Sequence, residues 1–191
     1  MVNILNLNES STHELLEKTE KILRAGGVAI VPTDTVYGLV CDGRNDAAKD
    51  RIFQMKGRSA SKPLIGFADT IEKVQRFAEA PPEKMPFLKE NWPGAVTFVL
   101  KAKVKLPRMT TEKGTIAFRI PDHRFLFSLM EKFEILASTS ANISGEKAPC
   151  RIEEISDGLK DKADIVIDGG IVPGTPSSIL DLTGKEHIRL R

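Results

Sequence analysis

Three cations, Lys56, Arg58 and Lys62, lie within seven residues of the chain around Gly57. Such a group is commonly a solvated helix end, where positive charge also complements the helix dipole. Arg58 and Lys62, however, lie beyond the expected end of the helix at Gly57. Charge-assisted hydrogen bonds contribute about 1.5–3 kcal/mol each, so the group suits a polyphosphate ligand. The chain contains no G-x-x-x-x-G-K-[ST] loop, which excludes a Walker A site.

The stretch AIVPTDTVYGLV, residues 29–40, places hydroxyl groups directly after an apolar run. One interpretation is a turn, in which Thr33, Asp34 and Thr35 bond to nearby backbone and Gly38 adopts a difficult backbone angle. The other is a binding site, because ligands in open α/β sheets lie outside the carboxyl ends of strands. On spacing alone the two interpretations carry equal weight.

Two further stretches are rich in uncharged hydrogen-bonding groups. ASTSANISG contains Ser138, Ser140 and Asn142, and it fits either a loop that caps a later helix or a set of donors for phosphate or ribose oxygens. It lacks the G-x-S-x-G pattern of a nucleophile elbow, so a serine hydrolase is a weak hypothesis. TPSSILDL places Ser177 at the start of a strand and would by itself be interpreted as a loop.

An arginine lies inside a predicted strand in TIAFRIPDH, residues 115–123. Strand alternation places Thr115, Ala117 and Arg119 on one face. An arginine on a strand face is commonly a solvated charge, but its planar fork also suits a bidentate contact with a carboxylate.

Composition limits the function classes. The 191 residues include 41% hydrophobic residues, enough for a core, and the formal net charge is only +2. This balance argues against a nucleic-acid coat or a membrane-surface protein. The two cysteines, Cys41 and Cys150, have no metal-type spacing and favour a reduced compartment.

The chain shows no sign of secretion or membrane insertion. No stretch approaches the roughly 20 apolar residues of a membrane helix, and the N-terminus lacks the features of a signal peptide. We therefore expect a soluble, cytoplasmic protein.

Strands and helices alternate along the chain, and the second half is rich in strands. The predicted strands are residues 28–31, 63–68, 95–101, 115–120, 135–137, 165–168, 178–182 and 187–190. The predicted helices run from a capping box at residues 11–14 to Gly26, from Asn45 or Asp46 to Gly57, from a cap at Asp69 through Phe77, and over residues 84–91, 124–133 and 152–159. This order predicts an α/β fold with a twisted mixed sheet, in one domain spanning residues 1–191.

Five stretches together resemble one family. PTDTVYGL, KGRSASKPLI, TIAFRIPDH, STSANISG and PSSILDL occur in the order found in the YrdC/TsaC family, and the resemblance covers the chain from about Gly26 onward. The family implies a twisted open mixed sheet with flanking helices around a concave basic pocket. Longer relatives carry an additional C-terminal domain, so a chain ending at Arg191 resembles the short, single-domain form.

The resemblance also implies an activity. Members of the family are L-threonylcarbamoyladenylate synthases, nucleotidyltransferases that convert L-threonine, bicarbonate and ATP to threonylcarbamoyl-AMP and pyrophosphate. Separate transferase machinery then modifies an adenosine next to the tRNA anticodon. Mg2+ is expected to arrive with ATP, held largely by phosphates and water. Whether tRNA binds weakly to the chain itself stays open.

The family motifs divide the implied site residues into two groups. The threonine side comprises Thr35, Thr115, Arg119 and Ser177, and Arg119 holds the carboxylate. The nucleotide side comprises Lys56, Arg58, Lys62, Ser138, Ser140, Asn142 and Arg191, and Arg189 competes with Arg191 for the last role. Lys56, Arg58 and Arg119 are the implied catalytic residues, and no protein metal ligand is implied.

The chain departs from the family pattern at two positions. Some relatives have a histidine near the threonine where this chain has Phe67, and some have a serine near the nucleotide where it has Ala148. Two alternatives remain: a related enzyme that forms another carbamoyl-adenylate, and a non-catalytic RNA-binding module. Near-zero net charge and the lack of an aromatic stacking platform weaken the second.

Overall fold

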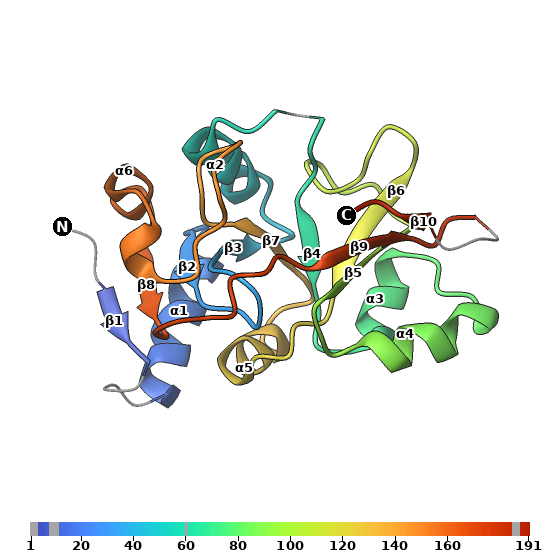
Figure 1. Ribbon diagram of the computed structural model, residues 1–191, viewed down its shortest axis with the longest axis horizontal. Coiled ribbons are helices and arrows are strands. Elements are labelled where there is room, and N and C mark those ends of the chain that lie inside the picture. Colours follow the sequence, from blue (N-terminus) through green and yellow to red (C-terminus); the bar gives the residue numbers. More distant parts are fainter. Residues whose placement is uncertain (1–3, 8–11, 60, 185–187) are drawn as a thin grey trace.

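A computed structural model describes residues 4–7, 12–59, 61–184 and 188–191 (Figure 1). Its described strands form one mixed sheet in the order β1-β8-β2-β3-β7-β4-β6-β5-β9-β10. The strands are β1 (Ile4–Asn6), β2 (Ala29–Val31), β3 (Gly38–Asp42), β4 (Ile65–Phe67), β5 (Val96–Lys101), β6 (Thr115–Arg119), β7 (Leu136–Ser140), β8 (Ile165–Asp168), β9 (Ser178–Asp181) and β10 (Ile188–Arg189). The predicted α/β class with a mixed sheet is confirmed.

Helices cover both faces of this sheet. They are α1 (Thr12–Arg24), α2 (Asp46–Lys56), α3 (Ile71–Phe77), α4 (Met85–Asn91), α5 (Arg124–Glu131) and α6 (Asp157–Lys160), with short 3-10 turns η1 (Pro82–Lys84) and η2 (Ile152–Glu154). Figure 1 shows α3 and α4 beside β5, and the C-terminal end next to β6. None of the helices in the described part of the chain is both long enough and apolar enough to span a bilayer.

Strand alternation separates two apolar clusters, one on each face of the sheet. One cluster joins Ile30, Leu39 and Phe118 to residues of α2, α3, α4 and α6. The other joins Ala29 and Val40 to residues of α1 and α5. Successive residues of β2 therefore enter different clusters, so this strand is covered on both faces.

Helix ends follow local capping chemistry, with one correction. The Asn45 side chain accepts a hydrogen bond from the Ala48 amide at 3.0 Å, and Gly57 ends α2 with a φ of 58°. The N-cap of α3 is Thr70, whose side chain accepts from the Lys73 amide, so the predicted cap at Asp69 was wrong. Asp69 instead forms an ion pair with Lys73 at 2.8 Å. The predicted capping box at residues 11–14 begins outside the described residues.

Two strands differ from the prediction near the expected site. Gly38 was expected to turn the chain with an unusual backbone angle, but it begins β3, which pairs antiparallel with β2 and β7. Its φ is not among the positive values found at other glycines. Strand β7 continues through Ser138 to Ser140, so these serines lie in the sheet rather than in a following loop.

Candidate functional site

One face of the sheet carries several of the predicted site residues. Residues opposite each other on neighbouring strands point to the same face. The pairs Phe67↔Arg119, Ile65↔Ser138, Gly38↔Ser140 and Lys101↔Thr115 therefore place four predicted residues on the face that α1 and α5 partly cover: Arg119, Ser138, Ser140 and Thr115.

The helices leave part of this face uncovered. Within the described chain, the apolar cluster of α1 and α5 includes Phe67 and Ile65 from β4 but no residue of β5 or β6. Thr115, Ala117 and Val99 are each partly exposed there. The small side chain of Ala117, between Thr115 and Arg119, leaves room above the strand for a ligand.

The loop after β2 is built by hydroxyl groups. Thr33 Oγ1 accepts from the amides of Thr35 at 3.0 Å and Val36 at 3.2 Å, and it lies 2.9 Å from Thr35 Oγ1. Both threonines are buried. The Thr33 hydroxyl therefore builds a turn, and this turn fixes the Thr35 hydroxyl where it meets Arg119. The binding-site interpretation stays a prediction.

Arg119 has three polar contacts through its guanidinium group. Its Nη1 donates to Thr35 Oγ1 at 2.8 Å, its Nε donates to the Gly94 carbonyl at 2.9 Å, and its Nη2 forms an ion pair with Asp34. Only 3% of the side chain is exposed. The structure thus brings together Thr35 and Arg119, which were both predicted on the threonine side, and it excludes the alternative of a solvated surface arginine.

Ser177 and Arg191 join this group from the end of the chain. Ser177 is buried, and its Oγ lies 2.8 Å from Thr97 Oγ1. Arg191 donates from Nε and Nη2 to the Ser177 carbonyl at 3.0 and 2.8 Å. Partial burial and the charge of Arg119 lower the pKa of Arg191. Arg189 instead donates to Ser178 Oγ and to the Arg191 carbonyl, and both arginines are exposed residues.

Lys56 is buried against the end of β7. Its Nζ donates to the carbonyls of Ser140 and Asn142, and it lies 3.2 Å from Asn142 Oδ1. Burial and the charge of Arg58 lower the pKa of Lys56 to about 7, although Glu146 opposes that shift. The oxygen acceptors around Nζ also favour the ammonium form. Three residues predicted on the nucleotide side, Lys56, Ser140 and Asn142, are therefore in direct contact.

Arg58 folds back over its own loop. Its Nε donates to the Lys62 carbonyl at 2.6 Å and its Nη2 to the Pro63 carbonyl at 3.0 Å. Burial lowers the pKa of its guanidinium. The two hydrogen bonds tie Arg58 to the backbone of Lys62 and Pro63, and we call these three residues the arch. Lys62 is exposed at the same arch.

Thr115 lies at the opposite end of β6 from Arg119. Four residue steps of about 3.3 Å separate them by roughly 13 Å, which one threonine molecule does not span. The parallel pairing of β4 and β6 covers Gly66↔Phe118 and Phe67↔Arg119. Before it, residues 108–111 lie between the two strands, because the Leu64 amide donates to the Arg108 carbonyl and Thr110 pairs with Ile116. Thr115 therefore lies at the same end of the sheet as the arch, beside Thr111 rather than beside Pro63. This geometry does not support a shared threonine contact for Thr115 and Arg119.

Sequence reasoning did not select three residues of this region. Asp34 was noted only as turn chemistry, and Thr97 was read as an ordinary strand residue. The signal for Thr97 was a hydroxyl at a buried strand position, visible only once the register is known. His123 faces Asp34 and Asp122, which raise its pKa, while burial lowers it and has the larger effect.

The two departures from the family pattern have different surroundings. Phe67 is buried in the cluster of α1 and α5, at the β4 position opposite Arg119. It therefore closes the apolar side of the group around Arg119. Ala148 lies in the irregular segment between β7 and η2.

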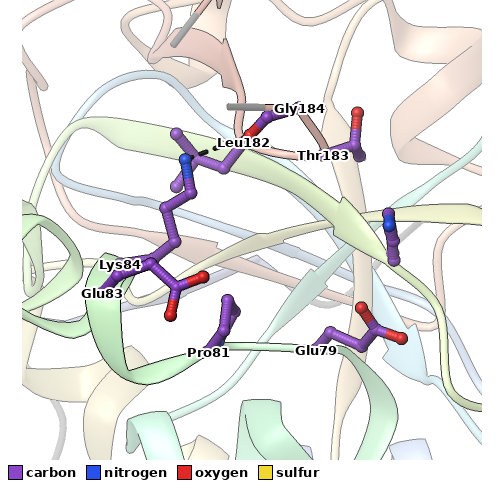
Figure 2. A pocket seen from close by; sticks show the side chains of 8 residues that line it. Glu79, Pro81, Glu83, Lys84, Leu182, Thr183 and Gly184 are labelled. Atoms are coloured by element: carbon purple, nitrogen blue, oxygen red, sulfur yellow. Dashed lines mark hydrogen bonds between the residues drawn. The ribbon is translucent and has the colours of Figure 1, made fainter. Parts of the chain in front are cut away.

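A cavity of about 510 Å3 lies elsewhere, between η1 and the end of β9 (Figure 2). Figure 2 shows Lys84 reaching the Gly184 carbonyl across it, at 3.1 Å, with Glu79 and Glu83 along its rim. None of the predicted site residues lines it. Its size alone therefore does not make it the candidate site.

The acidic and histidine side chains bear on metal binding. Across the described ranges, no three His, Cys, Asp or Glu side chains are grouped to hold a metal ion.

The chain resembles known proteins over its full length. The Sua5/YciO/YrdC family model, described as "Telomere recombination", matches residues 21–191. A threonylcarbamoyl-AMP synthase of Pyrococcus abyssi is 34% identical over all of this chain and 57% of its own length, and one of Thiobacillus denitrificans is 38% identical over 85% of this chain and 89% of its own.

A solved structure shares the fold. The crystal structure of P. abyssi Sua5 complexed with L-threonine has a TM-score of 0.90 and 32% identity, and it covers all of this chain and 57% of that one. The chain thus spans little more than half the length of the archaeal relative. Similarity in sequence and similarity in structure point to the same group of proteins.

Proposed function

Since the chain belongs to the Sua5/YciO/YrdC family, we propose that it forms threonylcarbamoyl-AMP from L-threonine, bicarbonate and ATP. The observation that carries the proposal is the uncovered sheet face, where Arg119 and Thr35 meet at one end and the arch of Arg58 lies at the other. Such a face suits two ligands of different charge, an amino acid and a triphosphate.

The threonine end suits an amino acid. Arg119 offers a planar fork to the α-carboxylate, and Thr35 offers a hydroxyl already aligned with that fork. Ser177, held by Thr97, adds a second hydroxyl nearby. These fixed contacts orient the amine toward the nucleotide, and positioning of this kind accounts for much of the rate in reactions between two bound substrates.

The nucleotide end suits the triphosphate. Lys56 and Arg58 would neutralise phosphate oxygens, with Lys62 at the exposed rim and Ser138, Ser140 and Asn142 as uncharged partners. We now assign Thr115 to this end, because β4 and β6 run parallel and the arch precedes β4 at the end of the sheet where Thr115 begins β6. Fixed cations also stabilise the negative charge that develops at the α-phosphate.

The reaction balances without a covalent enzyme intermediate. The threonine amine and bicarbonate give a carbamate and water. A carbamate oxygen attacks the α-phosphorus, the bond to the β-phosphate oxygen breaks, and pyrophosphate leaves. Magnesium would arrive with ATP on phosphate oxygens and water, and it would supply further charge neutralisation there. Such a nucleotidyltransferase would work in the cytoplasm, and its product would pass to separate tRNA-modifying machinery.

A pyrophosphate assay tests the proposal directly. The purified chain should release pyrophosphate from ATP only when both threonine and bicarbonate are present. Omitting either one provides the control for contaminating ATPase activity. Equal pyrophosphate release with and without threonine, or no release with all three substrates, would refute the proposal.

A further inference from the structure

The arginine proposed to bind the substrate carboxylate already holds a carboxylate. Asp34 forms an ion pair with Arg119 Nη2, with 13% of the Asp34 side chain and 3% of the Arg119 side chain exposed. A buried guanidinium without a partner would be costly. Asp34 therefore provides the charge partner of Arg119 in this structure. A substrate carboxylate has to share Arg119 with Asp34 or displace it.

The backbone around Asp34 is fixed while its side chain is not. Thr33 Oγ1 holds the amides of Thr35 and Val36, and the Thr35 carbonyl accepts from the Gly174 amide at 2.7 Å. The side-chain contact found for Asp34 is the one with Arg119. A change of partner by Asp34 therefore requires only a side-chain rotation, which leaves the Thr35 hydroxyl in place.

The surrounding charges favour a zwitterion over a plain carboxylate. Arg191 adds positive charge near Arg119, and the charges of Asp34 and Asp122 both act on His123. A plain carboxylate that took Arg119 would leave the Asp34 carboxylate without its partner. An amino acid brings its own ammonium group, so that one ion pair is replaced by two.

We propose that the substrate carboxylate displaces Asp34 from Arg119, and that Asp34 then binds the α-ammonium group of the substrate amino acid. The inference rests on the proposed function, since it assigns the amino-acid half of that site. It makes Asp34 a specificity residue that selects amino acids against carboxylic acids of the same shape. Selection of this kind comes from the unfavourable free energy of binding a ligand that leaves the Asp34 carboxylate without a partner.

Calorimetric titration with two ligands tests this exchange. The ligands are L-threonine and (R)-3-hydroxybutanoate, which keeps the carboxylate and hydroxyl but lacks the amine. Asp34→Asn should raise the Kd for threonine by about 10- to 150-fold, the size of one charge-assisted contact. The same variant should bind (R)-3-hydroxybutanoate at least as tightly as the wild type, because the competing carboxylate is gone.

Two further variants separate this role from general effects. Asp122 is exposed, and its charge also acts on His123. Asp122→Asn therefore removes an equal charge from the same region, and it should change either Kd by no more than about twofold. Asp34→Glu keeps the carboxylate and should keep the preference for threonine. Thermal melting of each variant shows whether it folds. The ratio of the two Kd values measured on the wild type tests the proposal without relying on any variant.

The outcomes distinguish the inference from its premise. An unchanged threonine Kd in Asp34→Asn, or an equal loss for both ligands, would overturn it, because Asp34 would then only support Arg119. Equal affinity of the wild type for the two ligands would overturn it as well. A wild-type chain that binds neither ligand would refute the proposed function itself.

Discussion

Arg119 has three contacts that a lysine could not reproduce. Its separate N–H groups reach Gly94, Thr35 and Asp34 in one plane, whereas an ammonium is a single point charge. We predict that Arg119→Lys weakens threonine binding by about 10-fold or more, the cost of one charge-assisted contact, with ATP affinity nearly unchanged. Calorimetric titration with each ligand measures both effects.

Thr35→Val provides the companion variant at the same contact. It keeps the shape of the side chain and removes the hydroxyl that accepts from Arg119. Thr35→Val should therefore also weaken threonine binding. If either variant lost ATP affinity and kept threonine affinity, the two ends of the proposed site would be reversed.

Arg58 combines a binding role with a structural one. Arg58→Ala should reduce adenylate formation about 10- to 150-fold, since one charge-assisted phosphate contact is lost. It also removes the two hydrogen bonds that tie Arg58 to Lys62 and Pro63. Arg44→Ala, at an exposed arginine with a 3.7 Å ion pair to Glu134, is the matched control for charge. Near wild-type turnover of a folded Arg58→Ala protein would remove Arg58 from the site.

The buried Lys56 predicts a pH effect. Its pKa is lowered to about 7 by burial and by Arg58. In the free protein, the folded state therefore binds fewer protons than the unfolded state above pH 7, so this residue makes stability rise with pH toward its ordinary pKa. A bound triphosphate should have the opposite effect on Lys56, because its negative charge raises the pKa of the ammonium group again.

ATP binding at pH 8 should therefore take up protons. Titrations in two buffers with different ionisation enthalpies measure the number of protons bound. Lys56→Gln keeps a donor but does not titrate, so proton uptake should disappear in this variant. Equal uptake by both proteins would assign the effect to another group.

Single residues were predictable where chemistry and spacing agreed. The cation group at residues 56–62 and Arg119 in its strand were visible in the sequence. Asp34 was visible as a residue but not as a partner of Arg119, because the two lie 85 positions apart and meet only through the sheet. A contact of this kind depends on strand order, which no local pattern contains.

The parallel course of β4 and β6 carries a prediction at the scale of elements. It places Thr115 at the end of the sheet where the arch precedes β4, and Arg119 at the other end. Thr115→Val should therefore raise the KM for ATP about 2- to 12-fold, as for one neutral hydrogen bond, and leave the KM for threonine unchanged.

A neighbouring threonine supplies the control for this variant. Thr111 Oγ1 lies 2.7 Å from Thr115 Oγ1, so Thr111→Val removes the same internal contact without removing the candidate ligand contact. Equal kinetic effects of the two variants would show that Thr115 acts only through its loop. An effect of Thr115→Val on threonine alone would restore the assignment made from the family motifs.

Element boundaries were least predictable next to the site. Strand β3 was missed because Gly38 was read as a turn signal after a loop rich in hydroxyl groups. Strand β7 was ended too early because Ser138 to Ser140 resemble a loop in composition. The two errors have separate physical causes. Gly38 lowers strand propensity at the start of β3, although Leu39 to Cys41 are fully buried, and the hydroxyl side chains of residues 138–140 lower it at the end of β7.

At the scale of the whole molecule, the candidate site joins distant parts of the chain. Thr35 comes from the first quarter, Arg119 from the middle and Ser177 with Arg191 from the end. Figure 1 shows the segment after β8 crossing the molecule to reach β9, and the Gly174 amide of this segment binds the Thr35 carbonyl. A ligand between these parts would cross-link them in the folded state.

Ligand binding should therefore raise thermal stability. A ligand that binds only the folded state at 100 times its Kd adds about 2.7 kcal/mol, and each kcal/mol shifts Tm by about 2–4 °C for a chain of this size. Threonine at that concentration should thus raise Tm by roughly 5–11 °C. Arg119→Lys at the same threonine concentration should show a much smaller shift, while its shift with ATP should match the wild type. A threonine shift that survives in Arg119→Lys would place the amino acid outside the group formed by Thr35, Arg119 and Ser177.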